Sequence, residues 1–287
     1  MKDRTWKLLD LLNEASGFFS SRDVDNPRLQ AEWLLSAALG VRRLDLYLQF
    51  DKILSPGEVE IFRGFVRRRL SGEPLQYITG EAAFRFLELE VNPTVLIPRP
   101  ETETLVDAAL ELLSERKRAR VLDPGAGSGA IGVAIASEHA DAHVTATDID
   151  LEALALARVN AERCNVADRM RFLCGDLFEP LSDTSRFDAI VCNPPYIRTA
   201  DLAGLDTEVR DYEPQRALDG GEDGLDFYRR IAAGSMALLA PDSHLLLEVG
   251  FDQADDVVQL LQLAGYEDVQ TRADLAAVQR VVTARSR

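Results

Sequence analysis

The sequence has few of the residues that build metal and disulfide sites. Its 287 residues include three Cys (Cys164, Cys174 and Cys192) and three His, and neither type is clustered. Three widely spaced cysteines make neither a disulfide framework nor a zinc site. We therefore expect no metal centre and look for the chemistry in other residue types.

Long apolar runs and excess positive charge are also missing. No stretch of about 18 apolar residues is present, and no signal-peptide pattern follows Met1. The formal net charge is −16, which disfavours non-specific binding to nucleic acid, because such binding needs Lys and Arg to neutralise phosphates. We expect a monomeric cytoplasmic protein that binds neither membrane nor nucleic acid directly.

The pattern along the chain predicts three parts. Residues 1–73 are typical of amphipathic helices, with a helix start at Asn26-Pro27 and a capping box over residues 55–58. Residues 74–92 form the second part, where residues 76–80 and 84–91 alternate like the paired strands of a hairpin linker. In residues 93–287 strands and helices alternate, which favours an α/β fold with a doubly wound, mostly parallel sheet. Six strands are predicted from the pattern, over residues 121–123, 144–147, 170–173, 187–192, 244–249 and 278–284.

The stretch Asn193-Pro194-Pro195-Tyr196 ends the fourth of these strands. Two consecutive prolines cannot continue a strand ladder, and they fix φ at two successive residues. Open α/β sheets bind ligands just outside the carboxyl ends of their strands. The Asn193 side-chain oxygen and the Pro194 carbonyl could accept both hydrogens of one planar NH₂ group. The alternative is an ordinary strand-ending turn with an exposed tyrosine.

This four-residue turn resembles the catalytic motif of S-adenosylmethionine-dependent methyltransferases that act on planar nitrogens. That class includes DNA and RNA amino-methyltransferases and the protein-glutamine N5-methyltransferases. The glycine-rich run from Gly125 to Gly129 follows a predicted strand, as a methyltransferase cofactor loop would.

A dinucleotide-binding dehydrogenase competes with this interpretation. Residues 127–132 also fit G-x-G-x-x-G, and Asp148 follows at the distance of an NAD-binding acid. Asp123, however, stands beside the loop, where its carboxylate would repel a pyrophosphate and suit the ammonium and sulfonium of S-adenosylmethionine. The Asn-Pro-Pro-Tyr turn has no role in hydride transfer, so we favour the methyltransferase.

A wider set of motifs resembles the release factor glutamine N5-methyltransferases. They are spread in the family's order over residues 75–80, 96–103, 127–129, 193–197, 213–214, 217–218, 220–221, 223–225 and 248–251. The resemblance implies a seven-stranded class I methyltransferase sheet of Rossmann-like type, with a small helical domain that recognises the substrate. It also implies methyl transfer to the glutamine of the Gly-Gly-Gln motif in peptide chain release factors, with S-adenosylmethionine as cofactor.

The resemblance also assigns residues to the site. The implied cofactor contacts are Gly125, Ala126, Gly127, Ser128, Gly129, Asp148, Leu177 and Asn193. The implied substrate contacts are Asn193, Pro194, Pro195, Tyr196, Arg99 and Glu101. Pro124, Ala126 and Leu177 depart from the commoner family pattern; Leu177 offers the adenine apolar packing without ring stacking.

Two other functions remain open at this stage. A nucleic-acid amino-methyltransferase would flip its base into the same pocket, although the acidic charge and the N-terminal motifs favour a protein substrate. A non-enzymatic binding module is the third alternative, and S-adenosylmethionine titration would test it.

Overall fold

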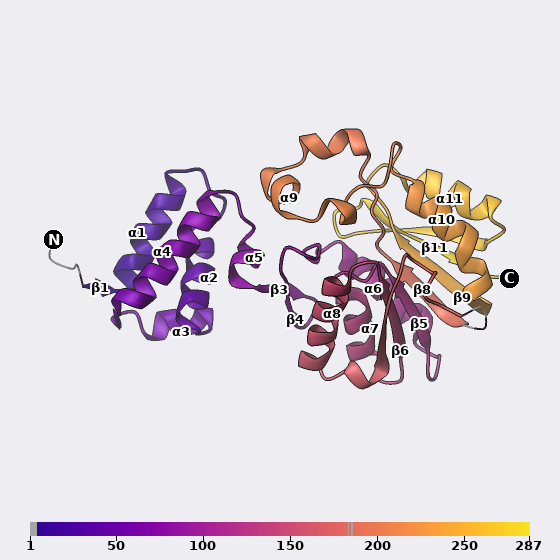
Figure 1. Ribbon diagram of the computed structural model, residues 1–287, viewed down its shortest axis with the longest axis horizontal. Coiled ribbons are helices and arrows are strands. Elements are labelled where there is room, and N and C mark those ends of the chain that lie inside the picture. The colour runs from indigo at the N-terminus through magenta and orange to yellow at the C-terminus, as the bar shows by residue number, and fades with distance from the viewer. Residues whose placement is uncertain (1–4, 183, 185) are drawn as a thin grey trace. The chain divides into compact units, whose positions relative to one another are not determined.

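The computed structural model describes residues 5–182, 184 and 186–287 (Figure 1). The described chain divides into two compact units, and each is presented by itself. The first is helical and comprises the residues up to Gly80 together with Thr207–Tyr212; the second comprises Glu81–Asp206 and Glu213–Arg287. The three-part division at residues 73 and 92 stays a prediction.

The helical unit packs short helices around one apolar core. Leu8, Phe19, Leu34 and Phe62 are among its buried side chains. Its helices are α1 (Leu8–Ser20), α2 (Pro27–Leu39), α3 (Arg43–Leu48), α4 (Pro56–Leu70), α5 (Leu75–Thr79) and α9 (Thr207–Tyr212). A two-residue pairing of β1 (Trp6–Lys7) with β2 (Ile53–Leu54) was not expected.

Two predicted helix starts have different outcomes. The capping box before α4 is confirmed, because the Ser55 hydroxyl accepts from the Glu58 amide at 3.2 Å and the Glu58 carboxylate accepts from the Ser55 amide at 2.7 Å. Helix α2 does begin at Pro27, but Asn26 has a left-handed conformation (φ 47°) and makes no side-chain cap bond.

The predicted strand over residues 76–80 is wrong. Residues 76–79 lie in α5, which follows Pro74 and is capped by Gly80 with φ 80°, a conformation that suits glycine. Tyr77 and Ile78 are both buried, whereas a strand would point them to opposite faces. The hairpin is shorter than predicted and pairs β3 (Glu81–Phe84) with β4 (Leu87–Glu90).

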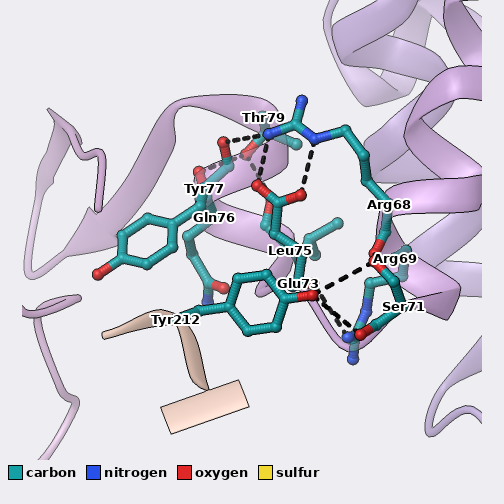
Figure 2. A network of polar contacts seen from close by, with 9 residues as sticks. All are labelled: Arg68, Arg69, Ser71, Glu73, Leu75, Gln76, Tyr77, Thr79 and Tyr212. Atoms are coloured by element: carbon teal, nitrogen blue, oxygen red, sulfur yellow. Dashed lines mark hydrogen bonds and ion pairs between the residues drawn. The ribbon is translucent and has the colours of Figure 1, made fainter. Parts of the chain in front are cut away.

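The short helix α9 belongs to the helical unit although it lies far along the chain. The Tyr212 hydroxyl donates to the Ser71 carbonyl at 2.9 Å, and Arg69 pairs with Glu208. Figure 2 shows Tyr212 beside Ser71, at the end of α4. The sequence pattern predicts no helix here, because a six-residue segment carries little periodicity.

The second unit is built on a seven-stranded sheet in the order β10-β11-β9-β8-β5-β6-β7. The five strands from β9 to β7 in this order are parallel to one another. At the other edge, β11 pairs antiparallel with β9, and β10 pairs antiparallel with β11. The strands are β5 (Arg120–Pro124), β6 (His143–Asp148), β7 (Met170–Cys174), β8 (Phe187–Cys192), β9 (Leu239–Glu248), β10 (Glu267–Ala273) and β11 (Gln279–Arg285). The pattern missed β10, because it is an edge strand with mostly exposed polar side chains.

Helices cover both faces of this sheet, as a doubly wound fold requires (Figure 1). They are α6 (Thr102–Leu113), α7 (Ala130–Glu138), α8 (Leu151–Arg163), α10 (Asp226–Ser235) and α11 (Ala254–Leu263). Short 3₁₀ turns lie at Ala167–Arg169, Thr199–Gly204, Gln215–Ala217 and Met236–Leu238. Alternate residues of one strand enter different cores: Val191 packs with α6 and α7, and Ile190 packs with α10 and α11. Among the described residues, no helix is both long and apolar enough to cross a bilayer.

Candidate active site

A cavity of about 260 Å³ opens at the carboxyl edge of the sheet, where β5 and β8 meet. The chain leaves β5 towards α7 on one face and continues after β8 on the way to α10 on the other, which makes this the topological switch point where such sheets bind ligands. The predicted site residues that line the cavity are Arg99, Gly125, Ala126, Gly127, Ser128, Asp148, Leu177, Asn193, Pro194 and Pro195.

Three predicted site residues, Gly129, Glu101 and Tyr196, do not line this cavity. A Cβ at Gly129 would lie 3.0 Å from the side chain of Ala157, so this glycine serves close helix packing. The Tyr196 ring lies against Gly250, and burial raises the pKa of its hydroxyl to about 12.

The glycine loop leaves its backbone open to the cavity. Gly125 and Gly127 have φ angles of 73° and 55°, which glycine adopts without strain. A Cβ built on either would meet nothing within 4 Å. The Thr147 carbonyl accepts from the amides of Gly125 and Ala126 at 2.8 and 3.0 Å, which fixes the loop against β6. The loop therefore presents rigid, uncovered backbone to a ligand.

Asp148 lies at the end of β6 and faces the same cavity. Its carboxylate accepts from the Gly127 amide at 2.9 Å and from the Asp150 amide at 2.9 Å. Burial raises the pKa of this carboxyl, and the Gly127 bond opposes that shift. A carboxylate can accept about four hydrogen bonds, so Asp148 keeps capacity for two hydroxyls of a ligand.

The next strand adds an acid that the sequence analysis did not assign. Asp176 follows β7, lines the cavity beside Leu177, and is held by Arg230 of α10 at 2.6 Å. Phe227, one turn earlier on α10, is a further lining residue. The signal was present in the sequence, because Asp176 follows β7 as Asp148 ends β6.

The Asn193 turn lines another part of the cavity. Asn193 donates from Nδ2 to the Thr102 hydroxyl of α6 at 3.2 Å. The Cys192 thiol, just before it, donates to the Pro124 carbonyl at 3.0 Å and so joins the ends of β8 and β5. Asn193, Pro194 and Pro195 all line the cavity, which gives it a rigid polar edge.

The segment Pro98-Arg99-Pro100 also reaches the cavity, because Pro98 and Arg99 line it. This guanidinium pairs with the buried Glu213 carboxylate, which also accepts from the Ile97 amide at 3.4 Å. Arg216 lies a few residues after Glu213, pairs with Asp150, and donates to the Thr94 carbonyl at 3.2 Å. These bonds hold residues 213–217 in place beside the cavity, which Arg216 and Ala217 line.

Asp123 is fully buried beneath the glycine loop. Its Oδ2 accepts from the Gly132 amide at 2.9 Å, and its Oδ1 has no hydrogen-bond partner among the described residues. Burial raises the pKa of this carboxyl to about 7. Asp123 does not line the cavity, so a direct contact with a ligand, as its position in the sequence suggested, is not seen.

Comparisons with known proteins agree with this architecture. The family models described as PrmC N-terminal domain and Methyltransferase small domain match residues 10–80 and 103–206. A release factor glutamine methyltransferase from Geobacter sulfurreducens is 46% identical over 284 residues, covering 99% of this chain and 98% of that protein. Another from Nitratidesulfovibrio vulgaris is 42% identical, covering 97% and 95%.

A solved methyltransferase structure from Pyrococcus furiosus has a TM-score of 0.52 and 19% identity, covering 76% of this chain and 96% of that one, and it supports the fold alone. The identity to the two relatives extends over nearly their whole length, through both the helical unit and the sheet unit. The chain belongs to the release factor glutamine methyltransferase family.

Proposed function

We propose that this protein transfers a methyl group from S-adenosylmethionine to the N5 amide nitrogen of the glutamine in the Gly-Gly-Gln motif of peptide chain release factors. The observation that carries this proposal is one cavity with two different walls. One wall is the open glycine loop with Asp148, and the other is the rigid Asn193-Pro194-Pro195 turn.

The glycine-loop wall fits S-adenosylmethionine. Gly125 and Gly127 leave room for a ligand against the backbone, Asp148 has lone pairs left for two ribose hydroxyls, and Leu177 offers apolar packing to an adenine. When bound, this cofactor supplies an electrophilic methyl group on a sulfonium. We assign Gly125, Ala126, Gly127, Ser128 and Asp148 to this role.

The second wall would orient the substrate amide. An amide nitrogen is a weak nucleophile because its lone pair is delocalised, so the task of the protein is orientation and electrostatic stabilisation. The Asn193 side-chain oxygen and the Pro194 carbonyl would accept the two amide hydrogens. Both acceptors stabilise the positive charge that develops as the nitrogen–carbon bond forms. The nitrogen then loses a proton to water.

The helical unit is our candidate for recognition of the release factor. It exposes Leu44, Leu48 and Phe50, each more than half exposed, and Ile53 at 64%. Such apolar side chains are common anchors in protein interfaces. We expect the activity in the cytoplasm, by a monomer. The net charge of −16 disfavours direct binding to nucleic acid.

The test is radiolabelled methyl transfer to purified release factor, run in parallel with DNA and ribosomal RNA. A matched factor with the Gly-Gly-Gln glutamine replaced serves as the control. We expect label on the intact factor alone. Label on nucleic acid, or equal label on the substituted factor, would contradict the proposal.

A further inference from the structure

Glu248 is a buried carboxylate to which neither the family motifs nor the cavity assigns a task. It ends β9, is 1% exposed, and does not line the cavity. A buried charge is costly unless it is paired or hydrogen-bonded. The Thr102 and Asn193 side chains lie close enough to its carboxyl to lower its pKa, while its Oε2 has no partner among the described residues.

The strand register explains why Glu248 meets Asn193. Strands β8 and β9 are parallel, with Cys192 opposite Leu247, so the two following residues lie side by side at the carboxyl edge. Thr102 reaches them from the first turn of α6 and is 4% exposed. Glu248 of β9, Thr102 of α6 and Asn193, directly after β8, therefore lie together, and Asn193 is hydrogen-bonded to Thr102.

The direction of each hydrogen bond in this group is fixed by chemistry. An ionised carboxylate can only accept, and the Asn193 amide can donate only through Nδ2. Nδ2 donates one hydrogen to the Thr102 hydroxyl, 3.2 Å away, and its second hydrogen is the one available to the Glu248 carboxylate. Because the Thr102 hydroxyl accepts from Nδ2, its own hydrogen is available to Glu248. The Asn193 Oδ1 is the one amide atom left for a ligand.

We propose that Glu248 is the positioning residue of the active site, which acts with Thr102 to fix the Asn193 amide with Oδ1 as acceptor towards the substrate NH₂. The proposal deepens the proposed function and rests on it. A negative charge behind the amide also polarises it towards Oδ1, which strengthens the acceptor as positive charge develops on the substrate nitrogen.

Protonation would release this arrangement. A protonated Glu248 gains an O–H donor, which can bond to Oδ1 and so permits the opposite amide orientation. Burial raises the pKa of Glu248 to about 7, although bonds from Thr102 and Asn193 oppose the shift. Because activity needs the ionised form, the methyl-transfer rate should fall as pH decreases through about 7.

Titratable groups from several neighbouring elements surround Glu248, and they are either charged or neutral near pH 7. The charged ones are Arg280 of β11, which favours the ionised form, and Glu101 before α6, which disfavours it. The uncharged ones are Cys192, Tyr196 and Tyr228. The thiol and both hydroxyls have raised pKa values, so they stay neutral in the range where Glu248 titrates.

The experiment measures single-turnover methylation of the release factor from pH 5.5 to 9, at saturating S-adenosylmethionine and factor. Glu248→Gln is expected to lower the rate at pH 8 by about 10- to 100-fold, the range of one hydrogen bond to a charged group. Its rate should not vary through pH 7, and it should equal the acid plateau of the wild type. Cofactor affinity by calorimetry should stay within about twofold, because Glu248 does not line the cavity.

Three further variants separate positioning from a structural role. Glu248→Asp keeps the charge. It should retain part of the rate and the fall in rate towards low pH, which we call the acid limb. Thr102→Val removes the bridging hydroxyl and should lower the rate while the acid limb remains. Asp123→Asn controls for the other acid with a pKa of about 7, and its acid limb should persist. If Glu248→Gln fails to fold, the pH–rate profiles of the wild type, Thr102→Val and Asp123→Asn still test the proposal.

The inference is overturned if Glu248→Gln has the wild-type rate and profile, or if Asp123→Asn abolishes the acid limb. It is also overturned if the wild type shows no acid limb. If wild-type enzyme labels no release factor, the proposed function fails instead; the Glu248 comparison is then made on whichever amide or amino substrate is labelled.

Discussion

Gln253 holds the carbonyl oxygen of Tyr196 at 3.0 Å through its side-chain amide. The same Nε2 donates to the Gly224 carbonyl at 3.2 Å, and Oε1 accepts from the Gly250 amide at 3.2 Å. Gln253 is 2% exposed. One buried amide therefore satisfies three backbone groups around the turn that carries Asn193.

Gln253→Ala should destabilise the sheet unit and slow catalysis together. Each buried backbone group left without a partner costs about 1–3 kcal/mol, so we expect a clear loss in the free energy of unfolding. Thermal or urea unfolding and the single-turnover rate measure the two effects. Gln259→Ala is the matched control, because Gln259 is exposed on α11, the helix that begins directly after Gln253. Equal stability of the two variants would contradict the assignment.

The sequence predicted most of the sheet because its signals are local. The apolar run of β8 ends in two prolines, and Asp150 caps α8 by accepting from the Glu152 amide at 2.8 Å. In α5 the local signal was misleading, because the aromatic and β-branched residues Tyr77, Ile78 and Thr79 are common in strands. Pro74 and the left-handed Gly80 decide in favour of a helix there.

The supports of the active site could not be predicted in the same way. Gln253 bonds to carbonyls 57 and 29 residues away, and Glu248 meets Asn193 only through the register of two parallel strands. These relationships depend on tertiary structure, and no spacing in the chain encodes them. Asp176 differs from these supports, because its position after a predicted strand can be seen in the sequence, although the sequence pattern alone assigned it no role.

Asp148→Ala should weaken S-adenosylmethionine binding and leave the fold intact. Charge-assisted hydrogen bonds are worth roughly 1.5–3 kcal/mol each, so the dissociation constant should rise about tenfold or more. Calorimetric titration measures this affinity, and circular dichroism checks the fold. Asp141→Ala is the control, because Asp141 is exposed just before β6. An unchanged affinity for Asp148→Ala would remove Asp148 from the cofactor site.

The double change Leu44→Glu and Leu48→Glu should impair recognition of the intact release factor. The two side chains are one helical turn apart on α3 and are 64% and 71% exposed. Loss of an interface anchor costs about 1–2 kcal/mol or more, so kcat/KM for the factor should fall about tenfold. Leu263→Glu on α11, 86% exposed, is the matched control.

A short Gly-Gly-Gln peptide separates recognition from chemistry in the same variant. Its methylation and the cofactor affinity should be unchanged, because the cavity lies wholly in the other unit. Surface substitution is preferred to deletion of residues 1–73, since deletion would remove the Ser71 and Arg69 partners of α9. Normal turnover of the intact factor by the double variant would reject recognition through this surface.

Asn193→Ala should abolish most of the chemistry with little effect on binding. It removes one of two acceptors for the substrate NH₂ while both prolines keep the turn rigid. Loss of one transition-state hydrogen bond in a desolvated site costs about 2.7–4 kcal/mol, or roughly 10² to 10³ in rate. Substrate affinity should change less, because the wider interface is untouched. Single-turnover methylation of the release factor measures the rate, with the glutamine-substituted factor as the blank.

Asn193→Asp is the more informative variant, because it keeps an acceptor oxygen towards the substrate and removes the Nδ2 donor. Its carboxylate cannot donate to Thr102 or Glu248, and it would lie beside the buried Glu248 carboxylate. Two neighbouring carboxylates cannot both ionise cheaply, so one pKa should rise strongly. We therefore expect a rate well below wild type and an acid limb moved to higher pH. A wild-type rate in Asn193→Ala, or an unmoved acid limb in Asn193→Asp, would show that this amide does not orient the substrate.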